Sequence, residues 1–369
     1  MLVILDATVF CADFQMSGNA FRVFFGGYRR AGLTPCIPQS VHDEVLNKYR
    51  EECAAFAAQA DKLARDASRV LGRVVMYFPE KTVLEAFISE YSARLHGLIS
   101  DHDFAYLRYP KISHKDLVAR ALARRRPFRD SGAGYRDSLL WEALLEHLVQ
   151  EPGPLALVTA NTRDFWARNG LHPDLCADIQ AMGLPVGHIR LFRTLEELNH
   201  TLIIPTLERL DDVRGKIENG TASFSLNKWV REDLPMFLWD EEGLGPLEPG
   251  HGRCRFSSVR TVKSLHVDAV RQVAPDQILL AATADVDGII DVSADWEDYQ
   301  RHDDVREFFQ SEDNESFTTT WADVPVRVTA AFSLILTAET LSVLSSELDW
   351  YETDYIKKVE LNPHPQDSV

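Results

Sequence analysis

The sequence predicts a three-layer α/β domain with a parallel sheet, followed by a smaller α+β domain with an antiparallel sheet. The chain has 369 residues, a length that suits two domains of roughly 100 to 200 residues each. Its first half alternates short apolar runs with longer amphipathic stretches, which is typical of strands joined by helical crossovers. Later in the chain, β-branched runs with partial alternation take over. We therefore expect one domain at residues 1–204 and a second at 205–369.

Three apolar runs are the expected strands of the first domain, namely Leu2–Leu5, Leu155–Thr159 and His188–Phe192. Several of the stretches between them carry alanine, leucine, glutamate and arginine at helical spacing. A further helix, Thr194–Thr201, is expected to close the domain, capped by its first residue and with a glutamate at the capping-box distance. The main helices are expected at Ser17–Ala31, Pro38–Leu71, Glu80–Ser100, Ser113–Arg125 and Tyr135–Gln150.

The second domain is expected to begin with a helical stretch at Leu226–Asp240, which contains tryptophan. The Gly- and Pro-rich segment Gly243–Gly252 then predicts a linker or a long loop. From Arg255 onward, runs such as ILLAATADVDGIIDVSADW predict the strands of an antiparallel sheet.

The formal net charge of −17 argues at first against a nucleic-acid partner, because Lys and Arg must neutralise its phosphates. The two halves of the chain differ, however. Residues 1–200 contain 24 Lys and Arg against 24 Asp and Glu, whereas residues 201–369 contain 15 against 32. The acidity belongs to the second half, so the net charge does not exclude nucleic acid as a partner of the first.

The N-terminus and the cysteines indicate a cytoplasmic protein. The opening MLVILDATVF has no basic stretch before its apolar run and contains an Asp, unlike a secretory signal. No apolar run approaches the roughly 18 residues needed to span a bilayer, so no membrane partner is expected. The five cysteines are widely spaced without a CxxC pair, which favours small core residues over a zinc site or disulfides.

Acidic and amide side chains gather where an α/β domain places its site, beyond the carboxyl ends of its strands. Asp6 ends the first apolar run, and Asn161 and Asp164 follow the run LALV. Glu44 and Asp137 come from helices, each near the start of the helix. Taken singly, Asp6 could cap the next turn and Asp137 could satisfy exposed amide groups. Taken together, these positions supply hard oxygen ligands suited to Mg²⁺ or Mn²⁺, ions that activate water for phosphodiester hydrolysis.

These segments resemble the motifs of the PIN domain family over Met1–Leu198. LALVTANTRDF looks like the family's strand-four signature, and ILDATVF resembles its first strand ending in Asp. IPQSVHDEV and GYRDSLLWEAL are similar to the segments that carry its next two carboxylates, and RRRPFRDSGAGYRDSLLW is similar to one PIN-like subgroup. The chain departs from the family at Ala7, where a Ser or Thr is usual, which leaves Thr8 to supply the hydroxyl group.

The resemblance implies a metal site whose ligands come from strand ends and from helices. Either Asn161 or Asp164 is expected to complete the site, and hydroxyl groups are expected to orient it by hydrogen bonds. The implied metal ligands are Asp6, Glu44, Asp137, Asn161 and Asp164, of which the four acids are catalytic, and the implied supporting residues are Thr8 and Thr159.

A basic segment lies just before Asp137 in the sequence. Residues 108–129 contain eight Lys and Arg and one acid, which suits contact with phosphates, and aromatic residues nearby are suited to base stacking. The alternative is a solvated helix face or a pairing surface for the acidic second domain. The expected phosphate contacts are Lys115, Arg120, Arg124, Arg125, Arg126, Arg129 and Arg136, and the stacking candidates are Phe104, Tyr106, Tyr109, Phe128 and Tyr135.

The resemblance implies a metal-dependent endonuclease that hydrolyses phosphodiester bonds of single-stranded nucleic acid, with RNA preferred to DNA. A toxin or an antiviral defence effector is the biological role that this activity suggests. The alternative is a PIN-like module that binds nucleic acid with little or no catalysis. A protein inhibitor and a second copy of the chain, forming a homodimer, remain open as protein partners.

Overall fold

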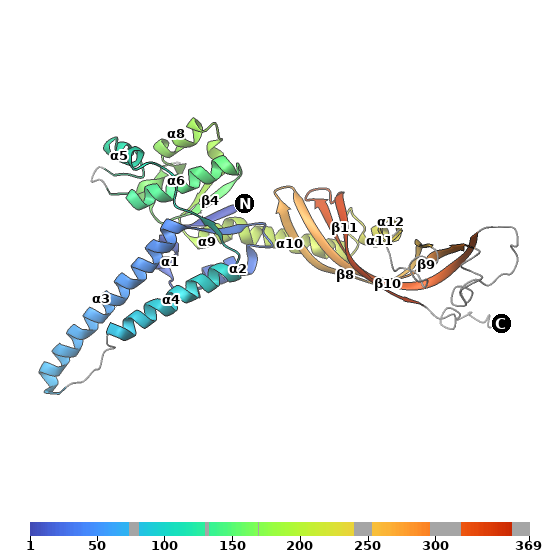
Figure 1. Ribbon diagram of the computed structural model, residues 1–369, viewed down its shortest axis with the longest axis horizontal. Coiled ribbons are helices and arrows are strands. Elements are labelled where there is room, and N and C mark those ends of the chain that lie inside the picture. The colour runs from blue at the N-terminus through green and yellow to red at the C-terminus, as the bar shows by residue number, and fades with distance from the viewer. Residues whose placement is uncertain (74–80, 130–132, 169, 240–252, 296–318, 356–369) are drawn as a thin grey trace. The chain divides into compact units, whose positions relative to one another are not determined.

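The computed structural model describes residues 1–73, 81–129, 133–168, 170–239, 253–295 and 319–355 (Figure 1). The chain divides into two compact units, Met1–Leu207 and Glu208–Val369. The first unit contains a parallel five-stranded sheet with helices, and the second contains a separate antiparallel four-stranded sheet. Both parts of the predicted fold class are thereby confirmed.

The sheet of the first unit consists of β1 (Leu2–Leu5), β2 (Thr34–Pro38), β3 (Ala105–Leu107), β4 (Leu155–Val158) and β7 (Ile189–Phe192). Its strand order is β3-β2-β1-β4-β7, and all neighbouring strands pair in parallel. Because the strands are parallel, their carboxyl ends meet at one edge of the sheet. The residues that follow β1 and β4 are therefore neighbours.

Three of these strands, β1, β4 and β7, correspond to the three apolar runs expected as the main strands, and β2 and β3 lie outside those runs. Every residue of β4 and all but the first residue of β1 are buried, as expected of strands covered on both faces. The sequence of β2, TPCIP, contains two prolines, and β3 has three residues of which none is buried. Neither segment shows the continuous apolar run that identifies a buried strand.

The five main helices predicted from the sequence are present, with bounds that differ by a few residues. Two short helices, α1 and α7, escape prediction because they are too short for a clear apolar period, and the nine-residue helix α8 is not predicted either. A two-stranded hairpin and a 3-10 turn precede β7. The elements are α1 (Ala7–Ala12), α2 (Asn19–Gly27), α3 (Gln39–Leu71), α4 (Lys81–Asp101), α5 (His114–Leu122), α6 (Tyr135–Gln150), α7 (Thr162–Phe165), β5 (Trp166–Ala167), β6 (Gly170–Leu171), α8 (Pro173–Ala181) and η1 (Val186–His188).

Helices α3 and α4 form a long helical hairpin (Figure 1). Although α3 has 33 residues, its buried residues all lie in its first two turns, between Ser40 and Val45. Gly72, at φ 66°, ends the helix in the left-handed conformation that favours glycine. The distal part of α3 therefore lies outside the hydrophobic core of the first unit.

Thr194 caps α9 (Leu195–Leu198) as predicted, because its Oγ1 accepts a hydrogen bond of 3.2 Å from the amide of Glu197. The Glu197 carboxylate accepts a bond of 2.7 Å from the amide of Arg193, one residue before the amide that a capping box uses. The chain then continues in helical conformation from the first unit into the second, through η2 (Asn199–Ile203) and α10 (Ile204–Glu218).

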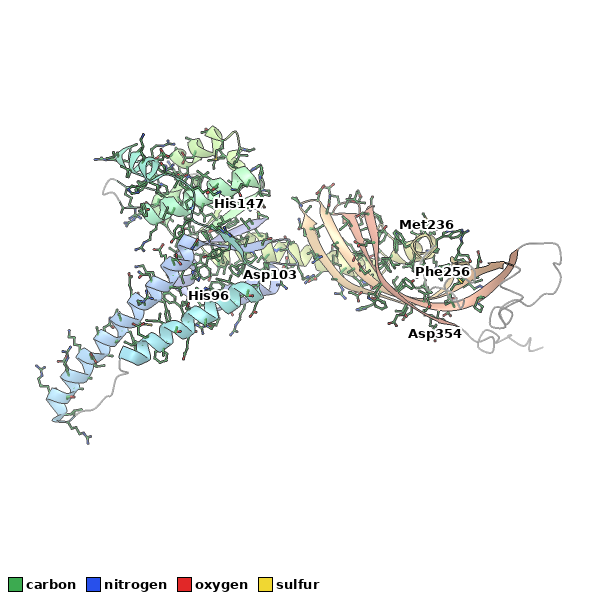
Figure 2. All side chains as sticks on the ribbon, viewed as in Figure 1. His96, Asp103, His147, Met236, Phe256 and Asp354 are labelled. Atoms are coloured by element: carbon green, nitrogen blue, oxygen red, sulfur yellow. The ribbon has the colours of Figure 1, made fainter. Side chains whose placement is uncertain are left out.

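The sheet of the second unit consists of β8 (Arg253–Ala274), β9 (Gln277–Asp295), β10 (Thr319–Thr337) and β11 (Val343–Tyr355), in the order β11-β10-β9-β8. Alternate residues of its strands form a second core with the helices of this unit. Phe256, labelled in Figure 2, is fully buried, and its ring fills the space that a Cβ at Gly288 would need. The glycine in β9 is thus explained by packing.

The predicted helix Leu226–Asp240 is present as two short helices, α11 (Leu226–Glu232) and α12 (Leu234–Phe237). Pro235 interrupts the helix because it has no amide hydrogen. The predicted loop Gly243–Gly252 lies outside the described residues. Across the described ranges, no helix has the length and apolar character needed to cross a bilayer. The five cysteines are free, and Cys36 is buried whereas the other four are partly buried.

Candidate metal centre

Asp6 lies directly after β1 and begins α1 as its N-cap residue. Its side chain is 5% exposed, and its Oδ2 accepts hydrogen bonds from the hydroxyl of Thr8 at 2.8 Å and from that of Thr159 at 2.7 Å. Thr159 follows β4, the neighbour of β1, so the parallel pairing brings these two strand ends together. Both threonines therefore hold the Asp6 carboxylate by hydrogen bonds.

Burial raises the pKa of the Asp6 carboxyl above its ordinary value, and the nearby negative charge of Glu44 raises it further. The hydrogen bonds from the two threonines and from the amide of Ala7 act in the opposite direction but do not cancel the rise. A buried carboxylate of this kind is costly unless a cation neutralises it.

Asp137 lies in the first turn of α6. Its Oδ1 accepts a hydrogen bond of 2.9 Å from Nδ2 of Asn161, which follows β4. Burial raises the pKa of Asp137 to about 7, and the charges of Asp6, Asp164 and Glu44 add to the rise. The carboxylate thus faces the other acidic residues across the strand ends, which favours a site residue over a helix cap.

The start of α6 depends on Gly134. This residue has φ 111°, a conformation open to glycine and strained for other residues. A Cβ at position 134 would also collide with the carbonyl oxygen of Pro127. The backbone of Gly134 accepts the hydrogen bond of the Ser138 hydroxyl at 2.9 Å, and Asp137 lies between these two residues in the chain. The glycine therefore sets the direction from which Asp137 enters the site.

Asp164 differs from the other acids because a guanidinium group binds it. Arg129 donates from Nε to Oδ1 at 2.6 Å and from its second nitrogen to Oδ2, and Arg126 lies 3.6 Å from Oδ1. Although full burial favours the neutral acid, the hydrogen bonds from Arg129 and Asn161 outweigh it and lower the pKa of Asp164. Asp164 is therefore an ionised carboxylate held in an ion pair.

Asn161 connects Asp137 with Asp164. Its Nδ2 donates to Oδ1 of Asp137 at 2.9 Å and to Oδ2 of Asp164 at 2.8 Å. Its amide donates to the hydroxyl of Thr159 at 3.0 Å. The side-chain nitrogen is thus used by the two carboxylates, and the side-chain oxygen is the atom that remains for another partner.

Glu44 lies on α3 and pairs with an arginine of α6. Its Oε1 accepts a hydrogen bond of 2.7 Å from Arg136, and both side chains are partly exposed. The negative charge of Glu44 raises the pKa values of Asp6 and Asp137, so the three acids belong to one electrostatic site. Beside them, burial together with the charges of Glu44 and Asp6 raises the pKa of Cys11 to about 11, which keeps the thiol protonated.

The donor set fits a divalent cation. Within the part of the chain that the structure describes, Asp6 and Asp137 make no ion pair with Lys or Arg, whereas Glu44 and Asp164 do. The same described residues contain no three His, Cys, Asp or Glu already close enough together to enclose a metal ion. Mg²⁺ suits such an open set, because it binds through one or two carboxylates and retains several water molecules.

Most arginines of the basic segment form ion pairs with Asp or Glu residues of the same unit. Arg120 is 9% exposed, and it binds Asp178 at 2.5 Å and Glu142 at 3.4 Å. Arg125 also binds Asp178, at 2.6 Å. We therefore revise the expected phosphate contact at Arg120 to a structural ion pair, because its guanidinium group has almost no exposed surface.

The remaining basic candidates differ in exposure. Lys115 and Arg124 lie on the surface, Arg136 pairs with Glu44, and Arg126 and Arg129 pair with Asp164. Hence the structure does not line all seven residues along one open surface. Sequence patterns suggest the charge of this segment, but its acidic partners come from positions far along the chain.

Exposed tyrosines lie near the acidic residues. The hydroxyl of Tyr109 donates to Oδ2 of Asp43 at 2.8 Å, next to Glu44 in the chain. Tyr106 and Tyr135 are also exposed, whereas Phe104 and Phe128 are buried and cannot stack on a base. Of the five aromatic candidates, the three tyrosines have free ring surface.

Comparison with models of known protein families gives a match to the PIN domain over residues 3–165. This range begins in β1 and ends in α7, so it contains all the candidate metal ligands. Neither the curated proteins nor the solved structures gave a match to the chain.

Proposed function

We propose that the protein is a metal-dependent endonuclease, because residues 3–165 match the model of the PIN domain, a fold whose members are generally nucleases. Its proposed substrate is single-stranded nucleic acid, with RNA preferred to DNA. The proposed cofactor is Mg²⁺ or Mn²⁺, bound at the carboxyl ends of β1 and β4.

One observation carries this proposal. Asp6 is a buried carboxyl group and Asp137 is a partly buried one, and the pKa values of both are raised by burial and by neighbouring negative charge. Ordinary folding energetics gives no reason to collect such groups without a cation. A divalent ion bound between them would remove the energetic penalty, and phosphodiester hydrolysis is the chemistry that a PIN domain would perform with it.

The residues have distinct proposed roles. Asp6 and Asp137 hold the ion, with Glu44 as a further acidic ligand. Thr8 and Thr159 fix the orientation of Asp6 by hydrogen bonds of 2.8 and 2.7 Å. Once bound, the ion would activate water and neutralise charge on the phosphate. The protein would hold the carboxylate oxygen atoms of these acidic ligands in place.

The sequence does not decide whether Asn161 or Asp164 completes the metal site, and we propose a different role for each. Asn161 positions Asp137 and presents its side-chain oxygen to the site, because its nitrogen is used by two carboxylates. Asp164 is bound by Arg129 and Arg126, so we propose that it supports Asn161 from behind. In this arrangement Asn161, rather than Asp164, lies toward the metal.

The test is cleavage of labelled single-stranded RNA and DNA with Mg²⁺, with Mn²⁺ or with chelator. We expect metal-dependent cleavage that is lost in Asp6→Asn and in Asp137→Asn, and faster cleavage of RNA than of DNA. Asp103→Asn is the matched control, because its side chain is 81% exposed and pairs only with Arg29 in the described ion pairs. Cleavage that survives chelator or both site variants would contradict the proposal.

One observation favours the second candidate, a nucleic-acid-binding module with little catalysis. Two of the four acids are neutralised by arginine, Glu44 by Arg136 and Asp164 by Arg129. Binding of RNA without cleavage under any metal condition would support this candidate.

We extend the first proposal to a growth-restricting toxin or defence effector, since uncontrolled hydrolysis of cellular RNA stops growth. Induced expression should then arrest growth for the wild type but not for Asp6→Asn at the same protein level. Equal growth of both strains would count against this role.

A further inference from the structure

Three tyrosines near the candidate metal centre expose their rings. Tyr106, Tyr109 and Tyr135 have exposed fractions of 46%, 43% and 48%. Single exposed aromatic rings are common on protein surfaces and need no explanation. Three such rings that lie together beside a functional site, and that are held in fixed orientations, indicate a surface for a flat apolar partner.

Tyr106 and Tyr109 border the start of α3. The ring centroid of Tyr106 lies 6.3 Å from that of His42, and the hydroxyl of Tyr109 donates to Oδ2 of Asp43 at 2.8 Å. Nδ1 of His42 lies 3.2 Å from the other carboxylate oxygen of Asp43, so the two contacts are linked. Both exposed rings are therefore held against the first turns of α3.

Tyr135 lies beside the next residue of α3. It precedes Arg136, which donates to Oε1 of Glu44 at 2.7 Å. Burial is the main cause that raises the pKa of Tyr109 to about 12, and Tyr106 and Tyr135 are among the groups that add to the rise. The three phenol groups are therefore neighbours, next to a candidate metal ligand.

The sheet places these tyrosines at the edge where the candidate metal ligands lie. β3 is an edge strand that pairs in parallel with β2, and β2 pairs in parallel with β1. Tyr109 lies just beyond the carboxyl end of β3, as Asp6 lies just beyond that of β1. Two strand spacings of roughly 4.8 Å separate β3 from β1, about 10 Å in all. At roughly 3.4 Å per nucleotide along a strand, a few nucleotides span that distance.

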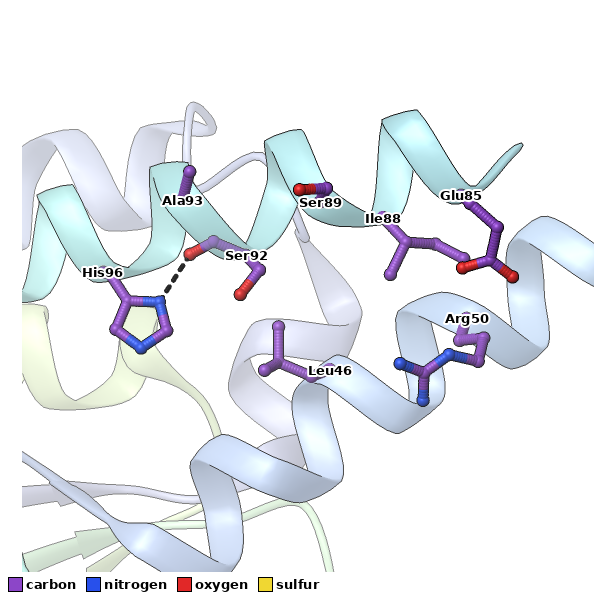
Figure 3. A pocket seen from close by; sticks show the side chains of 8 residues that line it. All are labelled: Leu46, Arg50, Glu85, Ile88, Ser89, Ser92, Ala93 and His96. Carbon is purple, nitrogen blue, oxygen red and sulfur yellow. Dashed lines mark hydrogen bonds between the residues drawn. The ribbon is translucent and has the colours of Figure 1, made fainter. Parts of the chain in front are cut away.

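The rings are supported from the side of α4. The ring of His42 makes an edge contact with that of His96, at a centroid distance of 4.8 Å. His96 lines a groove between α3 and α4, where its Nδ1 donates to the carbonyl of Ser92 at 2.7 Å (Figure 3). His42 thus has a ring on either side, with His96 behind it and Tyr106 toward the surface, and it is buried. The tyrosine surface therefore rests on a fixed base.

Two basic residues alternate with these tyrosines in the segment YLRYPK. Arg108 and Lys111 are exposed, and within the described residues neither side chain forms an ion pair. Arg120 and Arg125 differ, because both bind an acid of α8. Exposed aromatic rings beside basic side chains that are free to bind phosphates are the combination that binds single-stranded nucleic acid.

We propose that Tyr106, Tyr109 and Tyr135 form a binding site for unpaired bases of nucleic acid, with Arg108 and Lys111 binding the adjoining phosphates. The proposal rests on the proposed function for its ligand, and it adds a reason why the substrate is single-stranded. Bases within a duplex are stacked on each other, so only unpaired bases can stack on these rings. Because every base has a ring face, the site should show little preference for sequence.

The test measures binding of single-stranded RNA and DNA oligonucleotides to the full-length chain in chelator, where no metal-dependent cleavage occurs. We expect Tyr109→Ala and Tyr135→Ala each to weaken binding about 5- to 100-fold, the loss expected for one base–ring contact. Tyr109→Phe keeps the ring and should retain most of the affinity. Phe87→Ala is the matched control, because Phe87 is 45% exposed but lies on α4, and it should bind as the wild type does.

A second measurement separates stacking from a purely structural role. An abasic oligonucleotide keeps its phosphates but has no bases, so it should bind to the wild type and to Tyr109→Ala with equal affinity. Arg108→Gln should weaken the binding of both oligonucleotides and reduce the slope of log K against log salt by about 0.7. The tyrosine variants should leave this slope unchanged.

The base site and the nuclease can fail separately. Base-dependent binding without cleavage under any metal condition would reject the nuclease and keep the base site. Unchanged binding in both alanine variants would overturn the base site, and so would a wild type that binds neither RNA nor DNA. Equal losses with normal and abasic oligonucleotides would also overturn it, because the rings would then act only on the fold.

Discussion

At the scale of single residues, the four acids of the candidate site differ in what neutralises them. Arg129 binds Asp164 and Arg136 binds Glu44. By contrast, Asp6 accepts hydrogen bonds from threonine hydroxyl groups, and Asp137 accepts one from the side-chain amide of Asn161. The guanidinium group of Arg129 lets Asp164 remain ionised without a metal ion. The pKa values of Asp6 and Asp137 are raised, mainly by burial, so their ionised forms are the ones that a divalent cation would stabilise most.

Asp137 makes the stability of the metal-free protein depend on pH. Its folded pKa of about 7 lies above the ordinary value of 3.8, so the folded state binds the proton more tightly than the unfolded state. The contribution to stability is therefore favourable below pH 3.8 and is lost as the pH rises through 7.

We expect Asp137→Asn to be more stable than the wild type at pH 8 in chelator, by on the order of 1 to 3 kcal/mol, and this advantage should shrink toward pH 5. Urea unfolding at each pH measures the difference. An advantage that does not change with pH would show that the carboxyl group titrates normally.

Arg136 competes with a metal ion for Glu44. Its guanidinium group occupies Oε1 at 2.7 Å, and its side chain is 55% exposed. We expect Arg136→Gln to bind Mn²⁺ more tightly, because the substitution removes a competing positive charge, and to bind RNA several-fold more weakly. Titration calorimetry with Mn²⁺ and filter binding with RNA measure the two effects. Arg163→Gln, at an exposed position of α7, serves as the control. A loss of Mn²⁺ affinity in Arg136→Gln would contradict this role.

At the scale of elements, the site depends on where helices begin rather than on their length. α1 begins at Asp6 and α6 begins just before Asp137, so each helix start aims a carboxylate at the ends of β1 and β4. The positive φ of Gly134 determines the path of the chain into α6.

We expect Gly134→Ala to destabilise the fold by about 1 to 3 kcal/mol, because it combines backbone strain with a collision against the carbonyl of Pro127. Cleavage should fall as well, since the start of α6 would move. Gly153→Ala is the control, because nothing lies within 4 Å of its added Cβ. Thermal unfolding and the RNA cleavage assay give the two readouts. Equal behaviour of the two variants would show that the start of α6 tolerates a side chain.

At the scale of the whole molecule, the described residues form two hydrophobic cores that share no residue. One core contains residues from Val3 to Ile203, and the other contains residues from Leu210 to Leu341. The candidate metal ligands all belong to the first unit.

We expect two unfolding transitions in scanning calorimetry. Mn²⁺ should raise the midpoint temperature of only one of them. A ligand at about 100 times its dissociation constant stabilises the state that binds it by about 2.7 kcal/mol. Leu280→Ala, a deletion in the second core, should lower only the other transition. A single transition that responds to both changes would show that the units unfold together.

Much of this architecture can be predicted from local patterns. The apolar runs of β1, β4 and β7, the periodic helices and the Thr194 cap are properties of neighbouring residues, and they appear in the structure as expected. The position of Asp6 after an apolar run also predicts its place at the edge of the sheet. The strands β2 and β3 could not be predicted in this way, because prolines or shortness hide their period.

The sequence by itself determined the fold class and the acidic residues at the strand ends, because burial periodicity and strand ends are local features of the chain. Only the tertiary structure decided which cation neutralises which acid. Arg129 and Asp164 are 35 positions apart, and Arg136 and Glu44 are 92 apart. Such pairs form only when the sheet and helices bring distant segments together. They therefore cannot be predicted from the pattern of neighbouring residues.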